Sequence, residues 1–72
     1  VANEMELFIM LSKLDWDQVM AFAKSSSEIY ENDVSLLSVF PRFLSGGREV
    51  TRRQQIAIYR ILMRMKDEGF DI

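Results

Sequence analysis

The chain contains neither cysteine nor histidine, and it has only one proline and three glycines among its 72 residues. The missing cysteine and histidine exclude a disulfide framework and a Cys/His zinc site. They also remove two side chains that often serve as nucleophile or general base near neutral pH. We therefore expect the chain to fold by the packing of apolar side chains.

Long apolar runs and a basic amino-terminal segment are missing as well. Runs such as residues 7–11 fall far short of the roughly 20 residues that cross a bilayer. The first residues, VANEMELF, lack the basic region of a signal peptide. Together with the absence of cysteine, these features favour an intracellular protein without a membrane span.

The composition that is present is typical of a globular domain, with 49% apolar and 28% charged residues. A chain of 72 residues allows one domain, spanning 1–72. No segment alternates apolar and polar residues over the length of a strand. We predict an all-α fold, a small single-domain bundle of three to four helices in which the C-terminal helix is the longest.

Charge is unevenly spread along the chain, although the net charge is only −2. Residues 1–33 contain seven acids and two bases, whereas residues 34–72 contain seven bases and four acids. Between Arg42 and Lys66 the only acid is Glu49, which gives this window a net charge of +6. The sequence therefore predicts a basic patch on a mildly acidic protein.

The last third of the chain predicts one long helix with a clear start and end. Thr51 followed by Gln54 fits a capping box, which places the helix start near Arg52. Gly69 suits the left-handed position just past a helix end, and the phenylalanine after it fits a Schellman motif. The helix should therefore end near Glu68.

Residue spacing divides the surface of this helix into a narrow basic stripe and a broad apolar remainder. The stripe comprises Arg53, Ala57, Arg60 and Arg64. The apolar residues roughly opposite are Ile58, Leu62 and Met65. We expect a core helix that is packed by other helices and leaves the arginine stripe in water.

Two shorter helices precede it, and the segment that follows them is ambiguous. Residues 4–13 fit an amphipathic helix, and Asp15 fits the cap of a second helix that runs from Trp16 to residue 24 or 25, before the serines 25–27. Asn32 or Asp33 is a credible cap for the next segment.

The proline at position 41 interrupts that segment, because proline in a helix interior costs about 3 kcal/mol. Either the helix bends at Pro41, or Ser38 caps a fresh short helix whose first turn tolerates proline. Both versions end at Gly46 and Gly47.

No arrangement of residues predicts catalysis. The serines 25–27 have no recognisable base or oxyanion donor beside them, and Asp15 and Asp17 point to different sides of a helix. The glycine pair lacks the spacing and the lysine of a phosphate-binding P-loop. We therefore predict no catalytic residue, no metal ligand and no cofactor.

Arginines give the one functional signal above background. The candidate DNA-binding residues are Arg42, Arg48, Arg52, Arg53, Arg60 and Arg64. Several of them cluster at the amino end of the long helix, where free amides and the helix dipole favour phosphate. The plainer alternative is that these arginines solvate a core helix and pair with the acidic first half of the chain.

Aromatic residues leave two further interpretations open. Rings that could stack on unpaired bases are Trp16, Phe40, Phe43, Tyr59 and Phe70, although most are expected in the core. Phe43, which follows Arg42, is the one that we most readily expect at the surface. A second hypothesis is that Trp16, Phe40 and Phe43 form a surface that docks on a protein.

The run LLSVFPRFLSGGREVTRRQQIAIYRILMRMKDEGF, together with KLDWDQVMAFAKSSS, resembles the small accessory domains associated with the T4-type phage recombination helicase UvsW. The resemblance implies a non-catalytic helical module that works with a superfamily 2 DNA helicase in recombination, repair and replication-fork processing. Its implied partners are single-stranded or branched DNA and the helicase body, in the cytoplasm of a phage-infected host. The family supplies no list of DNA contacts, so the arginines rest on their own chemistry. We expect a monomer, since no coiled-coil seam is present.

Overall fold

The computed structural model describes residues 4–71 of the chain, and within them it contains helices and connecting turns but no strand. The helices are α1 (Glu4–Ser12), α2 (Trp16–Ser25), α3 (Glu31–Leu37), α4 (Val39–Leu44) and α5 (Arg52–Asp67). The predicted all-α fold class is confirmed. No helix in residues 4–71 is long and apolar enough to cross a membrane.

Helix α5 begins and ends as the sequence predicts, to within one residue. Thr51 accepts a hydrogen bond from the Gln54 amide on Oγ1 at 3.1 Å, and the Gln54 side chain accepts one from the Thr51 amide at 2.9 Å. At the other end Gly69 adopts a φ of 106°, and the Phe70 amide donates to the Met65 carbonyl at 2.9 Å. These contacts are the predicted capping box and Schellman motif.

The segment around the single proline consists of two short helices in succession. Helix α3 ends at Leu37 and α4 begins at Val39, so Pro41 lies in the first turn of α4, where no amide donor is required of it. This is the split version of the two that the sequence left open. Ser38 marks the boundary, but its hydroxyl donates to the Ser35 carbonyl at 2.6 Å instead of capping α4.

The predicted cap of α3 is wrong. The helix starts at Glu31, so neither Asn32 nor Asp33 is the cap residue. Asp33 instead acts from inside the first turn, where its Oδ2 accepts a hydrogen bond from the Tyr30 amide at 3.3 Å. The sequence pattern places the helix start too late because Asp33 bonds back to the amide of the cap residue, Tyr30, from the third position of the helix.

A glycine pair turns the chain from α4 toward α5. Gly46 has a φ of 95°, which favours glycine, and the Gly47 amide donates to the Arg42 carbonyl at 2.9 Å. A Cβ atom on Gly47 would lie 2.7 Å from that carbonyl oxygen. Glycine is therefore required for the tight approach that holds the α4–α5 connection in place.

The core lies between α5 and the other helices. The apolar side of α5 is buried as predicted, and Ile58, Leu62 and Met65 are each fully inaccessible to solvent. Side chains from the remaining elements complete the core, namely Leu7, Leu11, Trp16, Val19, Ala23, Ile29, Leu37, Phe40, Val50 and Ile61. One apolar cluster thus holds residues from all five helices together.

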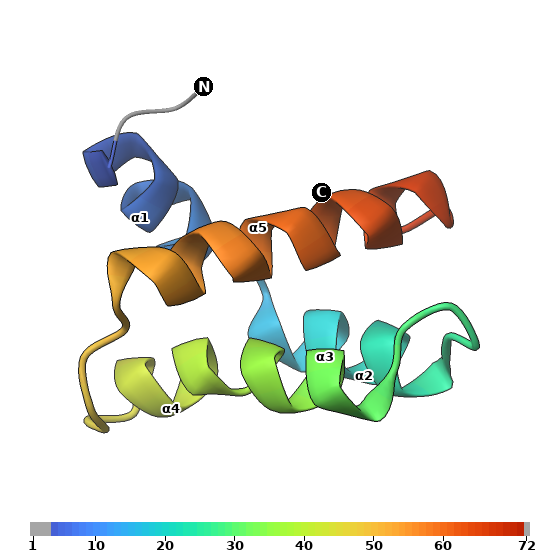
Figure 1. Cartoon of the computed structure of the whole chain (residues 1–72), viewed down its shortest axis with the longest axis horizontal. Coiled ribbons are helices and arrows are strands. Elements are labelled where there is room, and N and C mark those ends of the chain that lie inside the picture. The colour runs from blue at the N-terminus through green and yellow to red at the C-terminus, as the bar shows by residue number, and fades with distance from the viewer. Residues whose placement is uncertain (1–3, 72) are drawn as a thin grey trace.

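Figure 1 shows α5 running along the long axis of the molecule, with α3 and α4 following one another beneath it. Helix α5 packs on α3 and on α1, and α2 packs on α3. The molecule measures 29 × 26 × 19 Å along its principal axes. Residues 45–49 of the α4–α5 connection are exposed, as are Arg53, Tyr59 and Arg60 on the outward face of α5.

Candidate nucleic-acid interface

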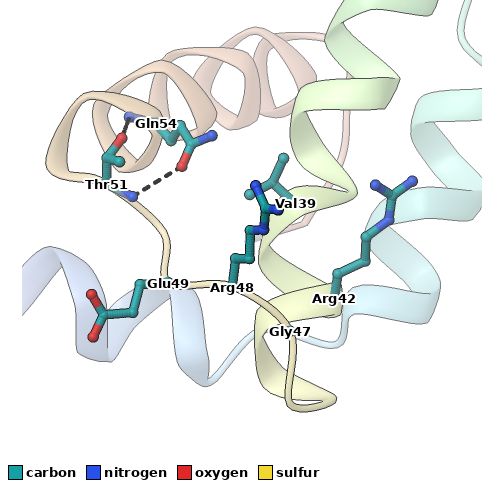
Figure 2. Close-up of a pocket in the computed structure, with 7 residues that line it drawn as sticks. All are labelled: Val39, Arg42, Gly47, Arg48, Glu49, Thr51 and Gln54. Atoms are coloured by element: carbon teal, nitrogen blue, oxygen red, sulfur yellow. Dashed lines mark hydrogen bonds between the residues drawn. The ribbon is translucent and has the colours of Figure 1, made fainter.

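A groove lies between α4 and the amino end of α5, beside the loop that joins them (Figure 2). Its volume is about 440 Å³. The residues that line it are Val39, Arg42, Gly47, Arg48, Glu49, Thr51 and Gln54. The groove is open at the surface, so it suits a group that approaches from solvent better than an enclosed small molecule.

Two arginines come to this groove from different elements. Arg42 lies in the last turn of α4 and Arg48 in the loop after the glycine pair. In Figure 2 the carboxylate of Glu49, the acid in this loop, points away from both guanidinium groups. Because the Gly47 amide is tied to the Arg42 carbonyl, the backbone of the loop is held beside the end of α4. The turn therefore brings Arg42 and Arg48 to the lining of one groove, and in Figure 2 their guanidinium groups point to different sides of α4.

The first turn of α5 adds two more positive charges directly after the groove. Arg53 is exposed, whereas Arg52 is half-buried and its Nη1 atom is buried without a hydrogen-bond partner. The capping box already satisfies the Gln54 amide. An anion at this turn would meet the side chains of Arg52 and Arg53 together with the positive end of the helix dipole.

Arg60 continues this surface along α5. Its side chain is exposed and forms no ion pair with the residues that the structure describes. The spacing of about 100° per residue puts Arg60 within about 20° of Arg53 around the helix axis, two turns further along. The arginines from 42 to 60 thus extend from the groove onto the outward face of α5.

Arg64 differs from the other arginines of the predicted stripe. Its Nη2 atom forms an ion pair with Oδ2 of Asp33 at 2.8 Å. A second hollow at this end of α5 is lined by Arg64 together with Glu28, Tyr30, Asp67 and Glu68. The structure therefore surrounds Arg64 with acids, and it does not bring this residue together with the groove arginines.

The ion pair of Arg64 is the only one within residues 4–71. The alternative that the arginines pair with the acidic first half of the chain therefore holds at Arg64. The pairing does not occur at the other five candidates, and whether these only solvate the helix stays open; they are Arg42, Arg48, Arg52, Arg53 and Arg60. These five guanidinium groups have no carboxylate partner of their own in the described part of the chain, despite a net charge of −2.

Two of the aromatic residues that were expected to form a docking surface, Trp16 and Phe40, lie in the core. Trp16 and Phe40 are buried and stack on each other, with ring centroids 5.2 Å apart and planes at 16°. The Trp16 Nε1 atom donates to the Leu11 carbonyl at 2.8 Å. The expected docking surface around Trp16, Phe40 and Phe43 is therefore wrong, because two of its three rings fill the core.

Phe43, expected at the surface, is half-buried. Its ring contacts Phe8 and Phe40, with centroids 5.7 Å away in both cases. Phe70 likewise packs on Phe22 at 5.0 Å. These rings are held by other rings, so they do not offer free faces to a base.

Sequence reasoning missed the burial of Gln55, which is the only polar residue among the buried side chains in the described part of the chain. Its Nε2 atom donates to the Val50 carbonyl at 3.3 Å, while its Oε1 atom has no partner. The signal was present, because Gln55 lies three residues before Ile58 and shares its face of the helix. This contact ties the end of the loop to the first turn of α5.

No group of three or more acidic, histidine or cysteine side chains in residues 4–71 is placed to hold a metal ion. Among known proteins, no family model, no curated protein and no solved structure matches this chain. The function of the chain is therefore inferred from the geometry and charge of the arginine surface.

Proposed function

We propose that this chain is a non-catalytic nucleic-acid-binding module that holds the phosphate backbone. The residues that make these contacts are Arg42, Arg48, Arg52, Arg53 and Arg60. The observation that carries the proposal is that these five arginines lie in succession from the α4–α5 groove to the face of α5 without an ion-pair partner among residues 4–71. Arg64, which is paired with Asp33, is left out of the set.

The physical reason is that arginine presents a planar fork of donors that fits two phosphate oxygens. Each phosphate that is neutralised releases condensed counterions, and this release drives binding that is independent of sequence. An arginine already paired with a carboxylate must first give up that partner, whereas the five unpaired residues need not.

The resemblance to accessory domains of the UvsW helicase supports a more specific role within this proposal. The module would act with a superfamily 2 DNA helicase in recombination, repair and replication-fork processing. It would hold single-stranded or forked DNA while the ATPase motifs lie in the helicase body. Arginine contacts on one side of a small domain suit this task, since they follow a backbone regardless of base sequence.

A second candidate function is docking on the helicase body without contact to DNA. It is favoured by α1, whose outward side exposes Met5 and Ile9, 72% and 44% accessible to solvent. This surface replaces the one expected around the buried Trp16. It predicts no affinity for DNA in isolation and measurable affinity for the helicase.

The deciding experiment is an amide chemical-shift titration of the domain with a short single-stranded oligonucleotide at low and high salt. We expect shifts concentrated on residues 42–60 that fade as salt rises. Shifts confined to α1 and α2, or none at low salt, would refute phosphate binding. A titration with the helicase body then tests the second candidate.

A charge-reversal variant and a matched control complete this test. The R53E/R60E double variant should weaken binding and flatten its salt dependence. The K13E/K24E variant makes the same change in net charge at two exposed lysines, one just after α1 and one in α2. If both variants weaken binding equally, the affinity reflects total charge and not the arginine surface.

A further inference from the structure

The outward face of α5 also carries an aromatic ring that is partly open to solvent. Tyr59 is 37% exposed. Within residues 4–71 its ring makes no contact with another ring or a cation, and its hydroxyl makes no hydrogen bond. A large side chain is thus left partly open to solvent and without a ring partner on α5, the longest of the described helices.

Tyr59 is placed among the unpaired arginines. At about 100° per residue it lies within about 20° of Arg52 around the helix axis, and it directly precedes Arg60 in the chain. Arg52 and Arg60 are about 12 Å apart along the axis at about 1.5 Å per residue. The ring therefore lies between two phosphate contacts of the proposed interface.

The other exposed tyrosine provides a contrast. Tyr30 is 67% exposed, but it lines the hollow that also contains Glu28, Asp67 and Glu68. Carboxylates at that site repel a phosphate backbone, so exposure alone does not make a ring accessible to nucleic acid. Of the two tyrosines in the chain, only Tyr59 is both exposed and next to unpaired positive charge.

We infer that Tyr59 is a stacking platform for an unpaired base, held in place by phosphate contacts to Arg52 and Arg60, and that the interface therefore favours single-stranded over duplex nucleic acid. The inference rests on the proposed function and adds the substrate class. The charge around the ring is what identifies the occupant, because a nucleic acid strand is the polymer that offers anionic groups and aromatic faces together.

The preference for single strands follows from base accessibility. In a duplex the two faces of each base are covered by neighbouring base pairs, so a ring on the convex surface of a helix finds only edges and phosphates. In a single strand a base face is free to stack on Tyr59 while the arginines hold the backbone. The arginine contacts serve both forms, so the ring supplies the difference between them.

The test measures fluorescence anisotropy of a labelled oligo-dT strand and of a labelled blunt duplex of mixed sequence, each over a range of salt. The proteins are the wild type, Y59A, Y59F, Y30A and R53E/R60E. We expect Y59A to bind oligo-dT about 5- to 150-fold more weakly, the range for one lost stacked base. Its duplex affinity and its salt slope should equal those of the wild type, because no phosphate contact is lost.

The conservative variant separates stacking from other roles of the side chain. Y59F keeps the ring face and should bind as the wild type does, and Y30A should do the same because it alters the acidic hollow. Overlay of amide spectra verifies that Y59A retains the fold. If Y59F is as weak as Y59A, or if Y59A weakens duplex and single strand equally, the stacking role is refuted.

Failure of this inference is distinct from failure of the proposed function. A wild type that binds neither strand nor duplex refutes both. A wild type that binds, loses affinity in R53E/R60E and is unaffected by Y59A refutes only the stacking role, and phosphate binding stands.

Discussion

Arg60 and Arg64 are chemically identical residues four positions apart on the same stripe of α5, yet the structure gives them different surroundings. Arg64 forms an ion pair with Asp33 at 2.8 Å, whereas Arg60 has no carboxylate partner within the described range 4–71. Replacing each in turn by glutamine should therefore separate binding from stability. We expect R60Q to affect only DNA binding and R64Q to affect only folding.

The effect on binding follows from counterion release. Each phosphate contact on single-stranded DNA contributes about 0.7 to the slope of log affinity against log salt. R60Q should reduce the slope by about 0.7, which amounts to about a 2.6-fold smaller change in affinity over a fourfold change in salt. R64Q should leave both the slope and the affinity unchanged, because its charge is already matched by Asp33.

The effect on stability follows from the exposure of the ion pair. The Arg64 and Asp33 side chains are 47% and 22% accessible, so the pair is worth roughly 0.2–1 kcal/mol after screening by solvent. For a domain of this size that corresponds to a fall in Tm of about 1–8 °C. R60Q should leave Tm unchanged, since the Arg60 side chain forms no ion pair or hydrogen bond within residues 4–71.

The assay pairs anisotropy titrations at several salt concentrations with thermal unfolding of the same variants. D33N removes the other charge of the pair and serves as the control; its Tm should fall at least as far as that of R64Q, because Asp33 Oδ2 also accepts from the Tyr30 amide, and it should lose no affinity. A salt slope that falls as much in R64Q as in R60Q would contradict the division of the stripe.

Three further predictions concern the elements that position the arginine surface. G47A should destabilise the domain by about 1–3 kcal/mol, because its Cβ would lie 2.7 Å from the Arg42 carbonyl oxygen, and amide shifts in residues 42–52 should report the displaced loop. A midpoint of urea unfolding equal to that of the wild type would refute this prediction. T51A should cost about 0.5–2 kcal/mol of stability because α5 loses its cap, whereas T51S keeps the hydroxyl and should retain most of the wild-type stability. Equal stability of the two variants would show that the cap is unimportant. W16F should cost about 1–3 kcal/mol, because the Leu11 carbonyl at the end of α1 loses the indole donor 2.8 Å away. Urea unfolding followed by far-ultraviolet circular dichroism measures this cost. A loss of stability below this range would mean that water replaces the indole as donor.

Much of α5 could be predicted from local sequence because its limits depend on residues close together in the chain. The capping box joins Thr51 and Gln54, and the Schellman motif joins residues 65–70. The buried side could be predicted as well, since helical periodicity alone groups Ile58 with Leu62. The split at Pro41 was one of two versions that local rules allow, and tertiary packing decided between them.

The surface was less predictable because exposure depends on contacts between distant residues. Trp16 and Phe40 are 24 positions apart, and nothing in the local sequence of either shows that their rings stack in the core. The start of α3 was also misjudged, because Asp33 caps from inside the helix instead of before it.

The sequence by itself determined the all-α class, the limits of the long helix and the set of arginines on its exposed side, because these follow from short-range hydrogen bonding and from helical periodicity. The tertiary structure alone decided which arginines are free. Asp33 and Arg64 are 31 residues apart, and only the packing of α3 on α5 brings their charges together. The fold also brings Arg42, Arg48 and the first turn of α5 to one groove. Which charges become neighbours depends on how the helices pack, and the order of the residues does not show it.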